Sequence, residues 1–131
     1  MNNQRLEIVG EIDRPQIICF CGSSRFVNEM AVLMWEFEKA GNICLGLHLM
    51  PNEYGKHRGY GENYSHLAEL EGVNVQMDEL HKRKIDIADK VFIVNVGGYI
   101  GDSTRSEIEY AKNLGKPVMY LETYKLYPKE K

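Results

Sequence analysis

QIICFCGSSR, residues 16–25, is the stretch that decides the fold. Its first six residues form an apolar run rich in β-forming side chains, which is typical of a strand buried on both faces of a parallel sheet. A glycine and two serines at 22–24 end that strand. Apolar residues at helical spacing follow over 25–40 and stop at Gly41. The stretch therefore predicts a strand, a tight loop and a helix, in that order.

The same alternation continues along the chain, with three further apolar runs and two further helical patterns. Strand–helix–strand units form right-handed parallel crossovers. We therefore expect an α/β fold of the Rossmann-like, flavodoxin-like type, a three-layer sandwich whose parallel sheet has the order 2-1-3-4. The predicted strands are 16–21, 43–49, 91–96 and 117–121, and the predicted helices are 25–40, 75–88 and 106–114.

Length and charge narrow the class of protein. The 131 residues fit a single domain, 1–131, in which 1–15 form a tail or hold an edge strand at 6–12. The net charge of −3 argues against a nucleic acid polymer as partner, because such binders usually carry a basic balance. No apolar run approaches the ~18 residues of a membrane span, and the N-terminal stretch has no apolar signal core. We expect a cytoplasmic protein that binds neither membranes nor nucleic acid polymers.

The three cysteines are Cys19, Cys21 and Cys44. The first two share one apolar run, so they are predicted to be buried thiols in a strand rather than a disulfide framework or a Cys-x-x-Cys redox pair. The spacing of the His, Cys and acidic residues shows no metal-ligand cluster. We therefore expect no metal and no cofactor.

The predicted strand order locates a ligand site. The chain reverses direction between the first and third strands, and open α/β sheets bind ligands at that switch point, beyond the carboxyl ends of the strands. The first loop there holds Gly22, Ser23, Ser24 and Arg25. A glycine, two hydroxyls and a helix N-terminus suit an anion, and an arginine can clamp a phosphate or carboxylate. Alternatively, Ser24 simply caps the helix, and the two roles are compatible.

The second loop, GGYIGDST, leads into a helix with Glu107 in its first turns. Asp102 or Ser103 can cap that helix, and Thr104 and Glu107 have the spacing of a capping box. Spacing alone favours this capping role. The alternative is that Glu107 directs its carboxylate into the crevice as a nucleophile or base on a sugar carbon, while Gly101 and Ser103 present an N–H and a hydroxyl to a phosphate.

Two further segments carry candidate groups. Residues 50–73 are rich in tyrosine and glycine, which suggests a lid whose aromatic rings, Tyr60 among them, stack on a base. A surface excursion with its own small core is the alternative. On the following helix, Asp78 and His81 are three residues apart and share a face, so they are candidate site residues as well.

Three blocks together, CFCGSSR at 19–25, IADKVFIVNV and GDSTRSEIEYA, resemble the nucleoside 2-deoxyribosyltransferase-like superfamily. They are especially similar to the 2'-deoxynucleoside 5'-phosphate N-hydrolases. The resemblance covers roughly 16–121 and implies a Rossmann-like sheet and cleavage of the N-glycosidic bond of a nucleoside or nucleotide. A weaker resemblance links CFCGSS and GGYIGDSTRSE to the phosphoribohydrolases that release cytokinin bases, whose loop is PGGxGTxxE.

The first resemblance implies roles for individual residues. Glu107 corresponds to the glutamate that attacks the anomeric carbon, after which the sugar passes to water or to another base. Gly101 and Ser103 correspond to the loop that contacts the 5'-phosphate. Ser23 and Arg25 correspond to first-loop positions near the same ligand.

The chain departs from the hydrolase pattern at two positions. Cys19 stands where the hydrolases have a tyrosine, and His81 stands where they have an aspartate. The helper carboxylate is therefore missing, shifted to Asp78 or replaced by His81. Two functions stay open: an N-glycosidase or base-exchange enzyme, and a non-catalytic nucleotide sensor on the same fold. In both cases we expect a small nucleoside or nucleotide ligand and a homo-oligomer, most simply a dimer, because the resembled family often completes its sites across subunits.

Overall fold

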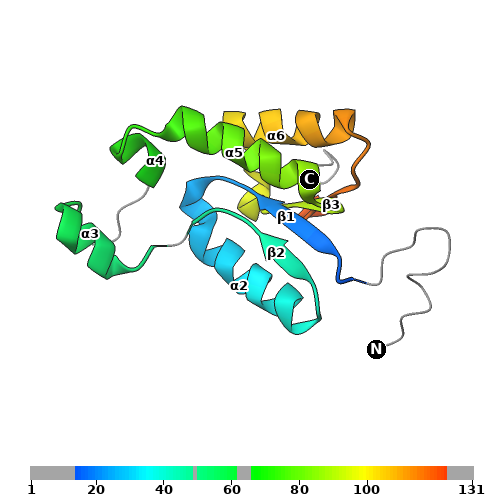
Figure 1. Ribbon diagram of the computed structural model, residues 1–131, viewed down its shortest axis with the longest axis horizontal. Coiled ribbons are helices and arrows are strands. Elements are labelled where there is room, and N and C mark those ends of the chain that lie inside the picture. The colour runs from blue at the N-terminus through cyan, green and yellow to red at the C-terminus, as the bar shows by residue number, and fades with distance from the viewer. Residues whose placement is uncertain (1–13, 49, 62–65, 124–131) are drawn as a thin grey trace.

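Four parallel strands form one sheet in the order β2-β1-β3-β4, as the sequence predicts. The computed structural model describes residues 14–48, 50–61 and 66–123 (Figure 1). The predicted edge strand at 6–12 lies outside the described residues. The strands are β1 (Ile17–Cys21), β2 (Ile43–Leu45), β3 (Lys90–Ile93) and β4 (Val118–Tyr120). The helices are α2 (Val27–Lys39), α3 (Asn52–Arg58), α4 (Leu67–Leu70), α5 (Asn74–Ile87) and α6 (Asp102–Asn113), with short 3₁₀ turns at Ser24–Phe26 and Val96–Gly98.

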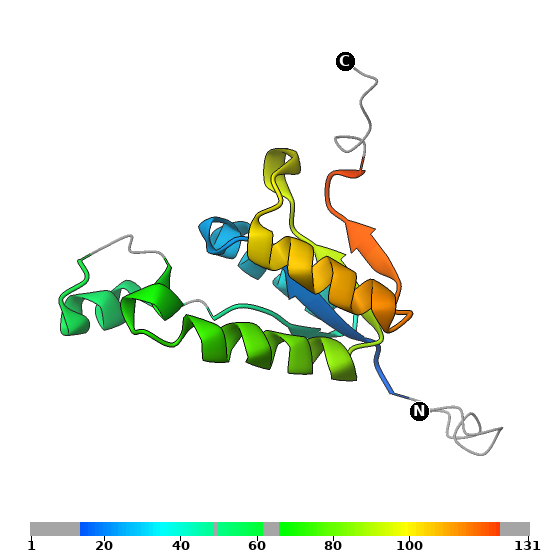
Figure 2. The same ribbon diagram turned by 90° about the horizontal axis from the view of Figure 1, so that it is seen from above.

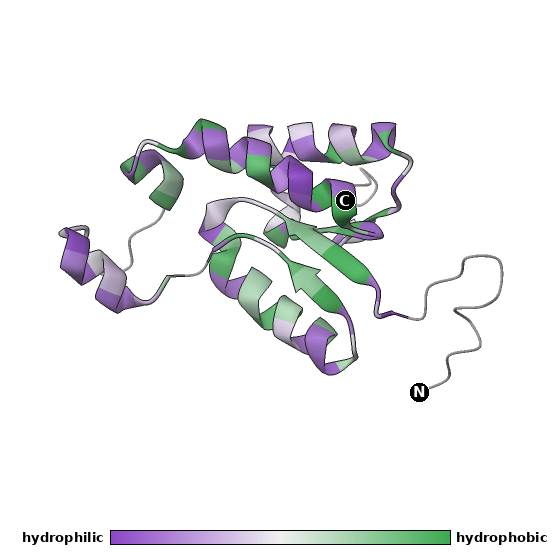
Figure 3. Ribbon diagram, in the orientation of Figure 1, coloured by the Kyte–Doolittle hydropathy of each residue, from purple (hydrophilic) through white to green (hydrophobic). Residues whose placement is uncertain are grey.

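The sheet lies between two helical layers (Figures 1 and 2). Helix α2 covers one face, and α5 and α6 lie side by side on the other. β1 and β2 are hydrophobic along their length, whereas the helices carry both polar and apolar residues (Figure 3). The expected three-layer α/β sandwich is therefore present. Within the described part of the chain, no helix is long and apolar enough to cross a membrane.

β1 supplies side chains to both halves of the core. Ile18 and Phe20 pack on the α2 side, and Cys19 and Cys21 pack on the α5–α6 side. Successive strand residues point to opposite faces, so a strand covered on both faces needs an unbroken apolar run. The prediction that Cys19 and Cys21 are buried thiols is confirmed, since both have no exposed surface.

The boundaries differ from the predicted ones. β2 is predicted to run to 49 but ends at Leu45, where Gly46 lies close to the sulfur of Met34 and the chain leaves the sheet. Helix α6 begins four residues before the predicted start, at Asp102, because the extended backbone of Gly101 opens the helix there. Residues 50–73 are not a plain loop, since α3 and α4 lie within their described parts.

Asp89, at the start of β3, ties the end of α5 to the first strand. Its carboxylate accepts a 2.8 Å hydrogen bond from the backbone N–H of Ile17 and two from the guanidinium of Arg14, at 2.7 and 3.0 Å. Hydrogen bonding from Arg14 and then from Ile17 lowers the pKa of Asp89 to about 2. The ionised carboxylate therefore stabilises the junction where β1 and β3 begin to pair.

We predict that Asp89→Asn lowers the free energy of unfolding by about 1–2 kcal/mol at pH 7, a value reduced for partial exposure of the ion pair. The native pKa lies below the unfolded one, so this stabilisation is present above about pH 4 and is lost as the pH falls through about 2. Urea unfolding of both proteins at pH 7 and at pH 3 measures it. A difference that widens toward low pH would contradict the assignment.

Candidate functional site

The first loop after β1 is shaped by a close backbone approach. A Cβ atom on Gly22 would lie 2.9 Å from the carbonyl oxygen of Val94, so this position admits no side chain without movement. Ser23, rather than Ser24, caps the turn that follows, and its hydroxyl accepts a 3.2 Å hydrogen bond from the Arg25 N–H. The predicted cap at Ser24 is wrong by one residue, because a 3₁₀ turn precedes α2. The Ser24 hydroxyl instead lies 3.0 Å from Nδ1 of His66.

Arg25 links the two loops at the carboxyl edge of the sheet. Its guanidinium lies 4.0 Å from the ring centroid of Tyr99, and its Nη2 donates a 3.3 Å hydrogen bond to the Tyr99 hydroxyl. The same tyrosine ring lies against Gly101. Tyr99 was not among the predicted site residues, although its place in the glycine-rich loop was visible in the sequence. The arginine of the first loop is therefore held next to the second loop.

A polar cleft of about 240 Å³ opens between α5 and the start of α6. Four predicted site residues line it, namely Asp78, Asp102, Ser103 and Glu107. Two lining residues were missed, Lys82 and Ser106. Lys82 lies four residues after Asp78, which places both on one face of α5, and this spacing was the signal available in the sequence.

Glu107 does not form the capping box that its spacing suggests. Among the described residues no side chain caps the start of α6, and Gly101 is its first boundary residue. The side chain of Glu107 is only 7% exposed and lies at the inner side of the cleft. Because Asp102, Ser103 and Thr104 already lie inside the helix, Glu107 faces the sheet one turn further on. The capping interpretation is therefore wrong, and the carboxylate is available to the cleft.

Burial raises the pKa of the Glu107 carboxyl, and the negative charges of Cys19 and Asp78 add to the rise. The positive charge of His81 and a hydrogen bond from the Cys21 thiol oppose it. Cys21 on β1 and His81 on α5 therefore favour the ionised form of Glu107, whereas the Asp78 carboxylate disfavours it. A buried acid with a raised pKa inside a polar cleft is a candidate for a functional group.

Cys19 and His81, the two departures from the hydrolase pattern, touch each other. The Cys19 sulfur lies 3.6 Å from Nε2 of His81, and the ligand atoms of Cys19, Cys21 and His81 all lie within 4.8 Å of one another. His81 is 3% exposed and the two thiols are fully buried. The expectation of no metal-ligand cluster is therefore corrected: the fold brings together three ligands that are far apart in sequence.

The pKa values of Cys19, Cys21 and His81 are shifted in different directions. A hydrogen bond from Cys21, and the contact with His81, lower the pKa of Cys19 to about 5, although burial opposes the shift. The same hydrogen bond and burial raise the pKa of Cys21 well above its usual value. Burial lowers the pKa of His81, but its hydrogen bond with Cys19 and the negative charges of Cys19 and Glu107 together outweigh burial, and the net direction is upward. The thiolate form of Cys19 and the imidazolium form of His81 therefore stabilise each other in the interior.

Several predicted site residues lie outside the polar cleft. Tyr60 donates a 3.0 Å hydrogen bond from its hydroxyl to Glu71, which also accepts from Tyr54. These contacts join α3 and Tyr60 to Glu71, the residue that follows α4. The other predicted residues that do not line the cleft are Gly22, Ser23, Ser24, Arg25, His81 and Gly101.

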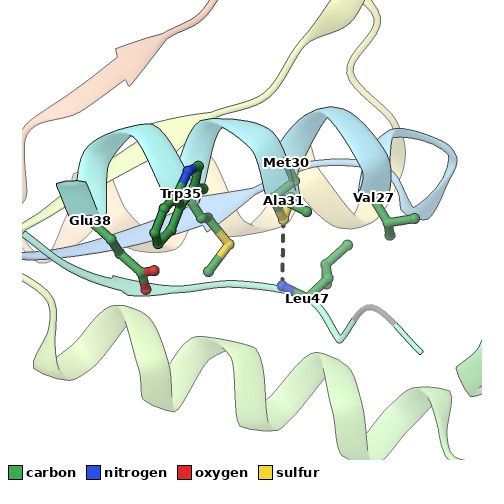
Figure 4. A pocket seen from close by; sticks show the side chains of 7 residues that line it. Val27, Met30, Ala31, Trp35, Glu38 and Leu47 are labelled. Carbon is green, nitrogen blue, oxygen red and sulfur yellow. Dashed lines mark hydrogen bonds between the residues drawn. The ribbon is translucent and has the colours of Figure 1, made fainter. Parts of the chain in front are cut away.

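A second hollow, of about 230 Å³, lies between α2 and Leu47 (Figure 4). Its lining is mostly apolar, with Met30 and Trp35 on the helix and a single carboxylate, Glu38, at one end. The N–H of Leu47 donates to the Met30 sulfur at 3.5 Å, which fixes the chain after β2. This hollow offers no pair of polar groups that could carry out acid–base chemistry.

The chemistry of the polar cleft follows from the residues that line it. No protein-family model, curated protein or solved structure matches the chain. The family resemblance rests on the sequence blocks alone. The cleft offers a buried glutamate, two exposed aspartates, a lysine and two serine hydroxyls around one opening.

The contacts of two glycines give a matched test of the site's framework. We predict that Gly22→Ala lowers the free energy of unfolding by about 1–3 kcal/mol, because the new methyl group meets a rigid backbone oxygen. Gly101→Ala should cost less than about 1 kcal/mol, because its nearest neighbour is the tip of the Tyr99 side chain at 3.2 Å, which can turn away. Denaturant unfolding of both variants measures the difference. Equal losses would show that the β1–β3 approach is not tight.

Proposed function

We propose that the protein cleaves, or exchanges, the N-glycosidic bond of a nucleoside or nucleoside 5'-monophosphate, with Glu107 as the nucleophile. The observation that carries the proposal is the position of Glu107, a carboxylate buried at the inner side of a polar cleft that Asp78 and Ser103 also line. Two carboxylates around one opening are the groups that a double-displacement glycosidase needs. The sequence resemblance points to the same reaction class.

The steps follow from the two carboxylates. A Glu107 oxygen attacks the anomeric carbon as the bond to the base nitrogen breaks, and the bonding electron pair leaves with the base. Asp78, in its acid form, donates a proton to the departing nitrogen. In the second step Asp78 takes a proton from water, whose oxygen attacks the same carbon and releases Glu107. In the exchange reaction the nitrogen of a second base takes the place of that water.

Three features of the cleft suit the sugar and its phosphate, whereas the exposed Asp102 carboxylate at the start of α6 opposes the phosphate charge. Lys82 supplies a positive charge, Ser103 a hydroxyl donor, and the N-terminus of the twelve-residue α6 supplies free N–H groups. The volume of about 240 Å³ is below the ~300–1,000 Å³ of pockets that enclose a whole drug-sized ligand. We therefore assign the cleft to the sugar phosphate, with the base extending beyond it, where Tyr60 is the proposed stacking partner.

Asp78, and not His81, is the helper group in this proposal. Asp78 lines the cleft, whereas His81 is buried behind it and is bonded to Cys19. The role of His81 is then to place a positive charge near Glu107, and it does not contact the substrate.

The free thiols at all three cysteines support a reducing, cytoplasmic location. The exposed Val32 and Trp35 of α2, at 61% and 59%, support a homodimer as the assembled form.

We predict that Glu107→Gln reduces base release from deoxynucleoside 5'-monophosphates by about 10³-fold or more, because an amide cannot form the glycosyl ester. The melting temperature should stay the same or rise, since a buried ionisable group is replaced by a neutral one of the same shape. Chromatographic detection of free base across a panel of nucleosides and nucleotides measures activity. The matched control is Glu109→Gln, an exposed glutamate on the same helix, which should keep full activity.

We further predict that Asp78→Asn reduces release of natural bases by about 10²–10⁴-fold, the usual loss when a general acid is removed. A nucleoside analogue whose leaving group needs no proton, such as a nitrophenyl deoxyriboside, should lose far less. Comparing the two substrates on the same variant measures this. Equal losses on both substrates would contradict the acid role, and a corresponding pattern in His81→Asn would move that role to His81.

A non-catalytic sensor is the second candidate, and one observation favours it. Cys19 and His81 replace the tyrosine and aspartate of the resembled hydrolases and bind each other instead of facing the cleft. If the wild-type protein binds a nucleotide in calorimetry but releases no base from any member of the panel, the sensor function holds and the enzymatic one is wrong.

A further inference from the structure

A cluster of two thiols and an imidazole lies behind the cleft, and the proposed reaction makes no direct use of it. Cys19 and Cys21 project from the same face of β1, and His81 meets them from α5. All three are buried, in the most enclosed layer of the molecule. A trio of polar, metal-ligating side chains at this depth calls for an explanation beyond packing.

We propose that Cys19, Cys21 and His81 form a binding site for one Zn²⁺ ion. This inference does not rest on the proposed glycosidase function. It rests on the identity of the donors, on their separations and on the rigidity of the elements that carry them.

The separations fit a tetrahedral zinc ion. With Zn–S near 2.3 Å and Zn–N near 2.0–2.1 Å, tetrahedral angles place sulfur and nitrogen about 3.6 Å apart and two sulfurs about 3.8 Å apart. The Cys19 sulfur and Nε2 of His81 are 3.6 Å apart, and all three donor atoms lie within 4.8 Å of one another. The ion would therefore require only small side-chain rotations and no movement of the backbone.

The elements that carry the ligands are held in place. β1 pairs with β2 on one side and with β3 on the other, so the strand that bears both thiols is fixed along its length. His81 lies one turn before the buried Ile85 of α5, which packs against the same two cysteines. Two elements, β1 and α5, thus converge with three donor atoms.

The donor set selects the kind of ion. Two thiolates and an imidazole are the ligands of zinc sites, whereas Mg²⁺ and Ca²⁺ prefer oxygen. Two thiolates balance the charge of one Zn²⁺, so the loaded site can stay buried without uncompensated charge.

A disulfide between Cys19 and Cys21 fits the geometry poorly. Residues two apart in a strand have Cα atoms about 6.6 Å apart and parallel Cβ bonds. A disulfide needs its Cβ atoms within about 4.5 Å, which would require β1 to buckle between its two paired neighbours. Metal binding needs no such distortion, since an ion bridges the longer gap.

The test uses the full chain, first treated with a chelator and a thiol reductant and then separated from both. Zn²⁺ is titrated in competition with a chromophoric chelator, and Co²⁺ is added in a parallel sample. We expect one Zn²⁺ per chain and, with Co²⁺, the sulfur-to-metal charge-transfer and visible bands of a tetrahedral thiolate site. Absence of binding, or a Co²⁺ spectrum without thiolate bands, would overturn the proposal.

Substitutions assign the ligands. Cys19→Ser, Cys21→Ser and His81→Asn should each weaken Zn²⁺ binding by at least about 100-fold. The control is Cys44→Ser, the remaining cysteine, which lies on β2 against α2 and should bind zinc as the wild type does. Equal weakening in the Cys44 variant would overturn the assignment.

A second measurement covers the case in which a buried substitution prevents folding. In the zinc-loaded wild-type protein, X-ray absorption at the zinc edge should show two sulfur ligands at about 2.3 Å and one nitrogen ligand at about 2.0–2.1 Å. A shell of oxygen and nitrogen ligands alone would contradict the site. Because neither assay contains a nucleotide, their outcome is independent of the glycosidase test, which is run with chelator present.

Discussion

β1 is enclosed on four sides, and the rest of the molecule is arranged around that enclosure. Backbone hydrogen bonds join it to β2 and β3, and side chains cover it from α2 on one face and from α5 and α6 on the other. Alternation along the strand then assigns each residue to one layer. The hydrophobic pair Ile18 and Phe20 fills the α2 side, while the sulfur-bearing pair Cys19 and Cys21 faces the helices that carry the ionisable groups.

The close packing of β1 on β3 also positions the loops. Gly22 brings the end of β1 against Val94, so the first loop and the glycine-rich second loop leave the sheet next to each other. Arg25 then stacks on Tyr99 and bridges them. At the opposite end, Asp89 binds the backbone of Ile17 and sets the register in which the two strands begin. The β1–β3 pair at the switch point is therefore fixed by contacts at both of its ends.

The fold was predictable because its signals are local and periodic. The unbroken apolar run at 16–21 fixed a doubly covered strand, and the strand–helix alternation fixed the parallel order. The start of α6 was not predictable in the same way, because Asp102, Ser103 and Thr104 are all good capping residues and the backbone of Gly101 opens the helix instead. The helices inside 50–73 were missed because their glycines and tyrosines carry no clear apolar period.

The candidate site was predictable only in part. The share of the cleft that comes from α6, with Glu107 and Ser103, followed from the second loop, and Asp78 followed from helical spacing. The thiol–imidazole cluster was not predictable, because Cys19 and His81 are 62 residues apart and a cysteine pair spaced by one residue is no metal motif on its own. Only the crossover that packs α5 on the Cys19 face of β1 brings them together.

Burial of so many ionisable groups in one layer requires them to compensate one another. Desolvation alone raises the pKa of Glu107 and disfavours a charged His81. Contact with Cys19 restores the charged form of His81, and that positive charge in turn favours an ionised Glu107. The pKa values of these groups therefore depend on one another, and removing the charge of one member shifts those of the others. A Zn²⁺ ion bound by the two thiolates and the imidazole would replace this balance, because its two positive charges offset the two thiolates.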